Sequence, residues 1–160
     1  MRLPHRGWCV PFVCSMMVLL FSLPAFADPF VDITVPAGIA LNGRNKGVAI
    51  ADVDGDGFLD MFVSNKGGPS HLYHNNGNGT FRDVTEEAGL DETGYAMGST
   101  FGDVNKDGRP DLYVAKGGRY EIESNRLYFN VSTPGHPKFV DVTETSGVGI
   151  KIFTYGATMF

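Results

Sequence analysis

An internal repeat is the feature that most constrains the fold of this chain. The segment GVAIADVDGDGFLDMFVSN at Gly47–Asn65 aligns without a gap with GSTFGDVNKDGRPDLYVAK at Gly98–Lys116, at an offset of 51 residues. A shorter motif, F-x-D-[IV]-T, begins at Phe30, Phe81 and Phe139. Self-similarity at a fixed period is typical of architectures in which each repeat is one supersecondary unit. We therefore expect similar units in series.

The residues of one unit predict four short β-strands. In the first unit these are GVAIAD, DMFVSN, HLYHNN and TFRDVT, and the last two are separated by the turn signal NGNG at 76–79. These segments are rich in β-branched and aromatic residues, and Asn-Gly supplies positive φ for a turn. Four strands in roughly 50 residues match a β-propeller blade. A β-sandwich is the all-β alternative, but it needs no such internal period.

The first 27 residues form a different kind of segment. A basic start is followed by an apolar run at Phe12–Leu23 and by AFA at 25–27, which is the layout of a secretory signal peptide cleaved before Asp28. The alternative is a membrane anchor. The apolar run is shorter than the roughly 20 residues that a spanning helix needs, so cleavage is favoured.

Cleavage would change the chemistry of the chain. It would remove both cysteines, Cys9 and Cys14, and with Arg2 and Arg6 gone it would leave 11 Lys and Arg against 18 Asp and Glu, a net charge of −7. An acidic chain disfavours nucleic acid and anionic lipid as partners and favours cations. An exported domain without disulfides needs another source of stability, such as bound metal. The expected location is extracellular, or periplasmic or at the cell surface in a bacterium, with no membrane span after cleavage.

The repeat divides the chain into successive segments. The expected parts are a signal peptide at 1–27, an N-terminal strand of the ring-closing type at 28–46, a first blade at 47–90, a second blade at 91–148 and the start of a third blade at 149–160. About two and a half blades cannot close a ring, which usually needs four to eight. The chain is therefore predicted to be a fragment, in which Phe30–Thr34 and the C-terminal TYGATMF are unpaired strand edges prone to association.

An acidic loop lies between the first two strands of each repeat. In the first loop, aspartates occupy positions 1, 3, 5 and 9, and Gly57 at position 6 supplies the positive φ for a sharp curl. The candidate ligands are Asp52, Asp54, Asp56, Asp60 and, through its carbonyl, Phe58. About six or seven oxygens in such a shell match the preference of Ca²⁺. A divalent cation would also offset the repulsion between the four carboxylates.

The second loop follows the same pattern. Its candidate ligands are Asp103, Asn105, Asp107, Asp111 and the carbonyl of Arg109, with Gly108 at position 6. An EF-hand would need flanking helices and an acid at position 12, where the two loops have Val63 and Val114. A polar turn without metal is the remaining alternative, and two loops in register make it hard to sustain. The second loop has one carboxylate fewer and adds Lys106 and Arg109, so it is expected to bind Ca²⁺ more weakly.

These motifs together resemble a known family. The D-x-D-x-D-G-x-x-D loop, the 51-residue period and N-G-x-G-x-F-x-D-V-T at 76–85 are similar to FG-GAP/VCBS repeats, the propeller blades of integrin α-chains and of many secreted bacterial proteins. The resemblance extends to the exported cartilage acidic protein (ASPIC/UnbV-type) group and covers nearly all of residues 28–160. It implies a propeller fold and calcium ligation by the ten loop residues named above. Asn105 departs from the family's carboxylate pattern.

No residue pattern indicates catalysis. His71 and His74 are three apart on one strand, so they should point to opposite faces, as a surface residue and a packing residue. The sequence has no G-x-S-x-G and no phosphate loop, and a glycosidase-type acid pair would fit any carboxylate cluster. The chain is expected not to be an enzyme.

The expected function is that of a secreted, calcium-binding, integrin-α-like propeller module. Such a module would serve extracellular protein or glycan recognition, cell adhesion or scaffolding, and the fold does not fix the ligand. The alternative is the non-catalytic propeller part of a larger secreted hydrolase or lyase.

Overall fold

The computed structural model describes residues 30–39, 41, 43–118, 122–152 and 154–159. The predicted signal peptide at 1–27 lies outside the described residues. Residues from Asp32 onward form one compact unit, to which all elements below belong. Within the described ranges, no helix has the length and apolar character required to cross a bilayer.

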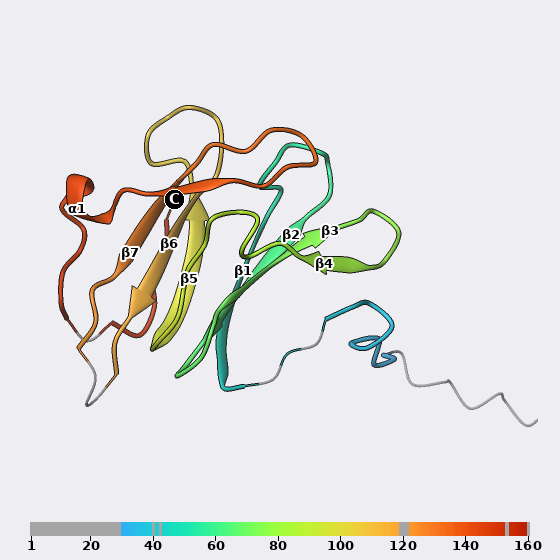
Figure 1. Cartoon of the computed structure of the whole chain (residues 1–160), viewed down its shortest axis with the longest axis horizontal. Coiled ribbons are helices and arrows are strands. Elements are labelled where there is room, and N and C mark those ends of the chain that lie inside the picture. Colours follow the sequence, from blue (N-terminus) through green and yellow to red (C-terminus); the bar gives the residue numbers. More distant parts are fainter. Residues whose placement is uncertain (1–29, 40, 42, 119–121, 153, 160) are drawn as a thin grey trace, which may run out of the picture. The chain divides into compact units, whose positions relative to one another are not determined.

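Two four-stranded antiparallel sheets make up this unit (Figure 1). The first consists of β1 (Asn45–Ala51), β2 (Asp60–Asn65), β3 (His71–Asn75) and β4 (Phe81–Asp83). The second consists of β5 (Ala96–Gly102), β6 (Asp111–Lys116), β7 (Arg126–Asn130) and β8 (Phe139–Asp141). In both sheets the spatial order of the strands equals their order in the sequence. The all-β class and the four-stranded, blade-like units predicted from the sequence are confirmed.

The two sheets repeat each other in register. Ala49 pairs with Phe62, and 51 residues later Thr100 pairs with Tyr113. The first hairpin of each sheet has a register shift at the same place, next to Gly47 and next to Gly98. The offset grows for the third and fourth strands because the two loops of the second sheet that precede them are longer. The sequence period is therefore a structural period.

An apolar core of described residues lies between the two sheets. Phe62 and Leu72 of the first sheet and Leu112 and Val114 of the second are fully buried in it. Burying a side chain of this size contributes about 1.5–3 kcal/mol, so this packing is a main source of stability. The inner strands approach closely, since a Cβ on Gly47 would lie 3.2 Å from the Cα of Gly98.

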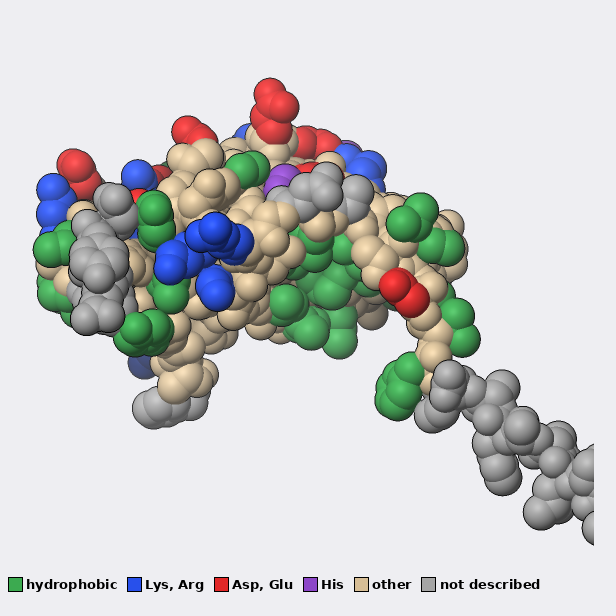
Figure 2. Space-filling view, turned by 90° about the horizontal axis from the view of Figure 1, so that it is seen from below, with side chains coloured by type: hydrophobic (Ala, Val, Ile, Leu, Met, Phe, Trp, Pro, Cys, Tyr) green, Lys and Arg blue, Asp and Glu red, His purple; other side chains and the backbone are tan. Residues whose placement is uncertain are grey.

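Strand β1 carries apolar side chains on both of its faces. Ala49 is buried toward the core, whereas Val48 and Ile50 on the opposite face are 55% and 58% exposed. Hydrophobic side chains also gather on the face of the molecule shown in Figure 2. An apolar run without alternation is typical of a strand with packing layers on both sides.

The F-x-D-[IV]-T motif forms a turn that joins consecutive units. In each copy the aspartate accepts a hydrogen bond from the threonine N–H at 2.8–3.0 Å, in the pairs Asp32–Thr34, Asp83–Thr85 and Asp141–Thr143. The residues that follow each of the first two turns bind the fourth strand of the next sheet along the chain. The N–H of Phe81 donates to the carbonyl of Ala37 at 2.7 Å, and that of Phe139 donates to Ala88 at 2.8 Å. This docking explains why the motif recurs with the period of the units.

The two segments predicted as unpaired strand edges lie outside both sheets. Residues 30–33 of the predicted N-terminal strand have no regular secondary structure, and 34–38 form a turn. Residues 154–159 also form no strand, although Gly156 lies beside Gly98 much as Gly98 lies beside Gly47. The fourth strand of each sheet pairs with the third strand of the same sheet. No described residue supplies such a partner strand to residues 30–34. A single helical turn, α1 (Thr143–Ser146), was not predicted.

A buried ionic cluster fixes the linker between β4 and β5 onto the second sheet. The carboxylate of Glu92 is fully buried, accepts a hydrogen bond from the Tyr128 hydroxyl at 2.5 Å, and lies 3.2 Å from Nζ of Lys116. Lys116 Nζ also donates to the carbonyl of Thr93 at 2.7 Å. Burial raises the pKa of Glu92, although these partners favour its charged form.

Replacing Glu92 by Ala should destabilise the fold strongly. The change leaves the buried Tyr128 hydroxyl without its acceptor and removes one of the two carboxylates that face the Lys116 ammonium, the other being Glu123 at 3.2 Å, a loss expected to cost at least about 1–3 kcal/mol of unfolding free energy. Urea denaturation measures it. Glu86→Ala is the matched control, because Glu86 is exposed and its removal should cost less than about 0.5 kcal/mol. Equal midpoints for the two variants would contradict the role assigned to the cluster.

The F-x-D-[IV]-T turns should make the fold sensitive to acid. Burial alone would raise the pKa of Asp83, but hydrogen bonds from Thr85 and the pair with His71 outweigh it and lower the pKa. The pKa of Asp141 is lowered in the same way by Thr143 and Arg126 against burial.

A carboxyl whose pKa is lowered by folding stabilises the fold above its unfolded pKa, near 4, and loses that contribution as pH falls through the folded pKa. We expect the Asp83→Asn/Asp141→Asn variant to show a flatter loss of stability than the parent between about pH 4 and pH 2. Urea denaturation at each pH gives the slopes, and parallel slopes would refute the assignment. The raised pKa of Glu92 makes the opposite contribution to the pH dependence of stability. That contribution is the same in the parent and in the variant, so it does not affect the comparison.

Candidate metal centre

The first acidic loop connects β1 to β2 and is curled by its own carboxylates. Each accepts backbone hydrogen bonds from further along the loop: Asp52 from Gly55 (2.8 Å) and Gly57 (3.0 Å), Asp54 from Asp56 (3.2 Å), and Asp56 from Phe58 (2.8 Å). Gly57 has a φ of 92°, the positive value that the sequence predicts for position 6. The curl brings one oxygen from each of Asp52, Asp54 and Asp56 within 4.8 Å of the others.

Asp60 closes the loop from the first residue of β2. It is fully buried, and its two oxygens accept hydrogen bonds from the N–H groups of Val53 at 3.1 Å and Asn75 at 2.8 Å. Burial raises the pKa of the Asp60 carboxyl, although these two bonds favour its charged form. The carboxylate is thus held between the loop and β3.

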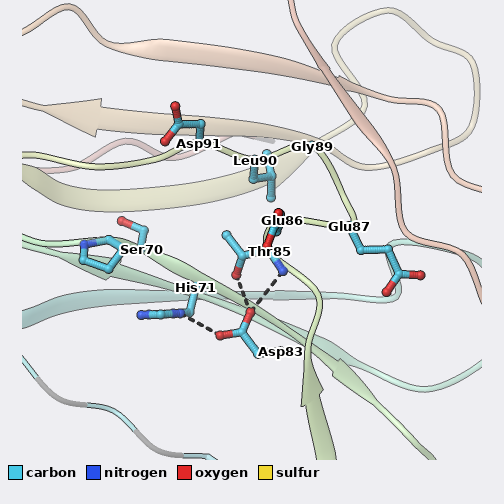
Figure 3. A pocket seen from close by; sticks show the side chains of 10 residues that line it. Ser70, His71, Asp83, Thr85, Glu86, Glu87, Gly89, Leu90 and Asp91 are labelled. Atoms are coloured by element: carbon cyan, nitrogen blue, oxygen red, sulfur yellow. Dashed lines mark hydrogen bonds and ion pairs between the residues drawn. The ribbon is translucent and has the colours of Figure 1, made fainter.

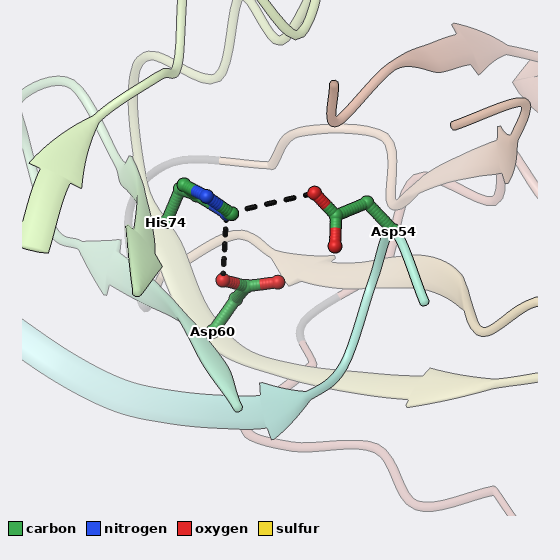
Figure 4. A group of neighbouring side chains, drawn as sticks. All are labelled: Asp54, Asp60 and His74. Carbon is green, nitrogen blue, oxygen red and sulfur yellow. Dashed lines mark ion pairs between the residues drawn. The ribbon is translucent and has the colours of Figure 1, made fainter. Parts of the chain in front are cut away.

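A residue that the sequence did not assign to the site completes this group. His74 of β3 is 7% exposed, and its Nδ1 lies 3.1 Å from Asp60 Oδ1 and 3.6 Å from Asp54 Oδ2 (Figure 4). It was expected to be a packing residue. The pairing of β2 with β3 could have identified His74. Met61 pairs with Tyr73, so the following residue of β3, His74, lies beside Asp60 at the end of the loop.

The other histidine of β3 points elsewhere. Nδ1 of His71 lies 2.7 Å from Asp83, whose other oxygen accepts hydrogen bonds from Thr85, at a surface groove beside Glu86 and Leu90 (Figure 3). The second sheet has the equivalent groove, with a 2.6 Å pair between Arg126 and Asp141. His71 and His74 therefore serve different sites, as their odd spacing on a strand requires.

The second acidic loop repeats the backbone of the first. Gly108 has a φ of 88°, and Asp111 accepts hydrogen bonds from the N–H groups of Val104 at 3.0 Å and Asn130 at 2.8 Å, just as Asp60 does in the first loop. The equivalent of Gly55 is Lys106, which takes a φ of 62° without being glycine. The curl is thus a property of the repeat.

The side chains of the second loop are engaged differently. Asp107 accepts hydrogen bonds from Arg109 Nη2 at 2.6 Å and from Asn105 Nδ2 at 3.0 Å. Burial would raise the pKa of Asp107, but its bonds to Arg109 and Asn105 prevail and lower it. In the part of the chain that the structure describes, no three acidic or histidine side chains of this loop converge as those of the first loop do. Phe129 occupies the position of His74.

The two loops also differ in their surroundings. Asp54 is 5% exposed, whereas Asp103, Asn105 and Asp107 are all exposed. Two neighbours cover this part of the first loop: Asn130 of β7 donates from Nδ2 to the carbonyl of Val53 at 2.7 Å, and His74 of β3 lies 3.6 Å from Asp54 Oδ2. A charge in the covered loop acts in a lower dielectric, so a bound cation would interact there more strongly.

The fold and the loops define a class of protein. Two four-stranded meanders in series, each with an acidic loop between its first two strands, are the repeating units of a propeller-type protein. Residues 52–114, which run from the first acidic loop into β6, match the family described as FG-GAP-like repeat.

Similar proteins carry the name cartilage acidic protein 1. The chain is 31% identical over 112 residues, 69% of its length, to the proteins of Mus musculus and Homo sapiens. It is 29% identical over 111 residues to that of Xenopus tropicalis. The matched part spans only 16–17% of these relatives. The resemblance stated from the motifs is confirmed.

Replacing Gly57 by Val should strain the first loop. A φ of 92° is unfavourable for a β-branched residue and should cost roughly 1–2 kcal/mol. Crowding adds nothing, because no heavy atom lies within 4 Å of a Cβ at this position. Urea denaturation without metal measures the strain, and Gly57→Asn is the control because Asn tolerates positive φ better. Equal losses in the two variants would show that backbone conformation is not the cause.

Proposed function

We propose that this chain is a secreted repeat module whose two acidic loops bind Ca²⁺ and thereby stabilise its blades for extracellular recognition. The observation that carries the proposal is the convergence of three carboxylates in the first loop. One of them, Asp54, has a buried Oδ2 without a hydrogen-bond partner. A buried carboxylate oxygen in this state is costly unless a cation or donor satisfies it.

The donor set of each loop fits a hard cation. Carboxylate, amide and carbonyl oxygens are the ligands that Ca²⁺ takes in flexible loops. In the first loop they would come from Asp52, Asp54, Asp56, Asp60 and the carbonyl of Phe58. In the second they would come from Asp103, Asn105, Asp107, Asp111 and the carbonyl of Arg109. The bound ion would supply positive charge that relieves the repulsion between the carboxylates.

The two loops should differ in strength. In the second loop the Arg109 guanidinium already neutralises Asp107, and that pair must open before a cation can bind. In the first loop the carboxylates are partly or fully buried, and no described arginine or lysine pairs with them. The first loop is therefore the stronger calcium site of the two.

A structural role for the ion, rather than a catalytic one, follows from its position. The first loop touches the second sheet through the bond between Asn130 and Val53, so ordering the loop also orders the junction of the two sheets. The predicted signal peptide and the acidic sequence favour an extracellular location for this module. The recognition role, toward a protein or a glycan, rests on the likeness to FG-GAP-like repeats.

Calcium titration of the purified chain by calorimetry tests the proposal. We expect two sites with dissociation constants near the range of about 10⁻⁴–10⁻³ M, the first loop being the tighter. Asp54→Ala should remove the tighter site and Asp107→Ala the weaker one. Saturation should raise the melting temperature, since calcium at 100 times the dissociation constant adds about 2.7 kcal/mol per site. Equal affinities, or a melting temperature indifferent to calcium, would refute it.

A further inference from the structure

A histidine of β3, His74, lies against the first acidic loop, although a calcium site built from oxygen ligands does not need it. His74 Nδ1 and Asp54 Oδ2 are both buried, both lack a hydrogen-bond partner, and lie 3.6 Å apart. Asp60 Oδ1 is 3.1 Å from the same nitrogen. Buried polar atoms without a hydrogen-bond partner call for an explanation, and a bound ion that both atoms ligate is one.

The distances are those of neighbouring ligands on one metal ion. Donor atoms bound at about 2.0–2.2 Å are about 3.0 Å apart in octahedral and about 3.4 Å apart in tetrahedral geometry. The separations of Nδ1 from the two carboxylate oxygens, 3.1 and 3.6 Å, are close to these values. The side chains need little movement to share a cation.

The imidazole nitrogen indicates which class of cation the site would bind. Ca²⁺ and Mg²⁺ take oxygen ligands, whereas imidazole nitrogen suits Zn²⁺ and the first-row transition ions. The second ring nitrogen of His74 faces Asp56 Oδ2 at 3.7 Å. A carboxylate beside the outer nitrogen is the arrangement that orients metal-bound imidazoles in proteins.

We propose that Asp54, Asp60 and His74 form a mixed nitrogen–oxygen site for a first-row divalent cation such as Zn²⁺ or Co²⁺. The inference deepens the proposed function, because it assigns a second class of cation to the first calcium loop. The second loop lacks this property, since Phe129 stands where His74 does and Asp107 is paired with Arg109. One repeat would thus bind Ca²⁺ or a transition ion, and the other Ca²⁺ alone.

The first experiment uses the parent chain with Cys9 and Cys14 replaced by Ser, because thiolates also bind these ions. Zn²⁺ is titrated while the ¹⁵N resonances of the imidazole rings are followed by NMR. We expect the Nδ1 resonance of His74 to shift on binding and those of His71 to stay. A His74 resonance unmoved at saturating Zn²⁺ would overturn the proposal.

The second experiment compares variants by Co²⁺ absorption. His74→Phe copies the second loop and should weaken Co²⁺ binding by at least the roughly 10–100-fold seen when outer partners of a metal ligand are changed. His74→Gln is a polar substitute should the Phe variant misfold, and His71→Phe is the matched control. Retention of parental Co²⁺ affinity in both His74 variants would show that the imidazole is only a neighbour of the carboxylates.

The same titrations separate this inference from the calcium proposal. Calcium binding at the second loop, removed by Asp107→Ala, should be indifferent to His74→Phe. Loss of calcium binding at both loops with the His74 shift intact would contradict the proposed function alone. Normal calcium binding at both loops without that shift would contradict the mixed site alone.

Discussion

The packing of the first sheet against the second is the interaction on which the rest of the structure depends. Neither four-stranded sheet covers its own apolar face, and Phe62 and Leu112 are buried only because the two faces meet. A sheet with an apolar face must bury that face against another element. The same contact places β7 over the first acidic loop. Part of the burial of that loop, at Val53, therefore comes from the packing of the two sheets.

Two loops with nearly the same sequence pattern thus become two different sites. Both curl on a position-6 glycine and both close on a buried aspartate, Asp60 or Asp111. What differs is the third strand of each sheet, which presents His74 to one loop and Phe129 to the other, and the cover that only the first loop receives. A repeat protein can in this way vary the chemistry of its sites without changing the repeated backbone.

The strands and the acidic residues were predictable because they depend on local rules. DMFVSN forms β2 with the predicted bounds, since β-propensity and the flanking turns decide it. The role of His74 was not predictable from spacing alone, because it depends on the register between β2 and β3. The segment Phe30–Thr34, predicted as an unpaired strand edge, lies outside both sheets for the complementary reason. Its sequence copies two real fourth strands, but a strand forms only where a neighbour supplies hydrogen bonds.

Asn130 connects the two loops physically. Its backbone N–H donates to Asp111 at the end of the second loop, while its side chain donates to Val53 in the first. The N–H of Val53 in turn donates to Asp60, so a continuous chain of hydrogen bonds joins one buried carboxylate to the other. These bonds are the direct contact through which the conformation of one loop would reach the other. Because coupling between sites is reciprocal, any effect that ordering of one loop has on the other must be matched by an equal effect in the opposite direction.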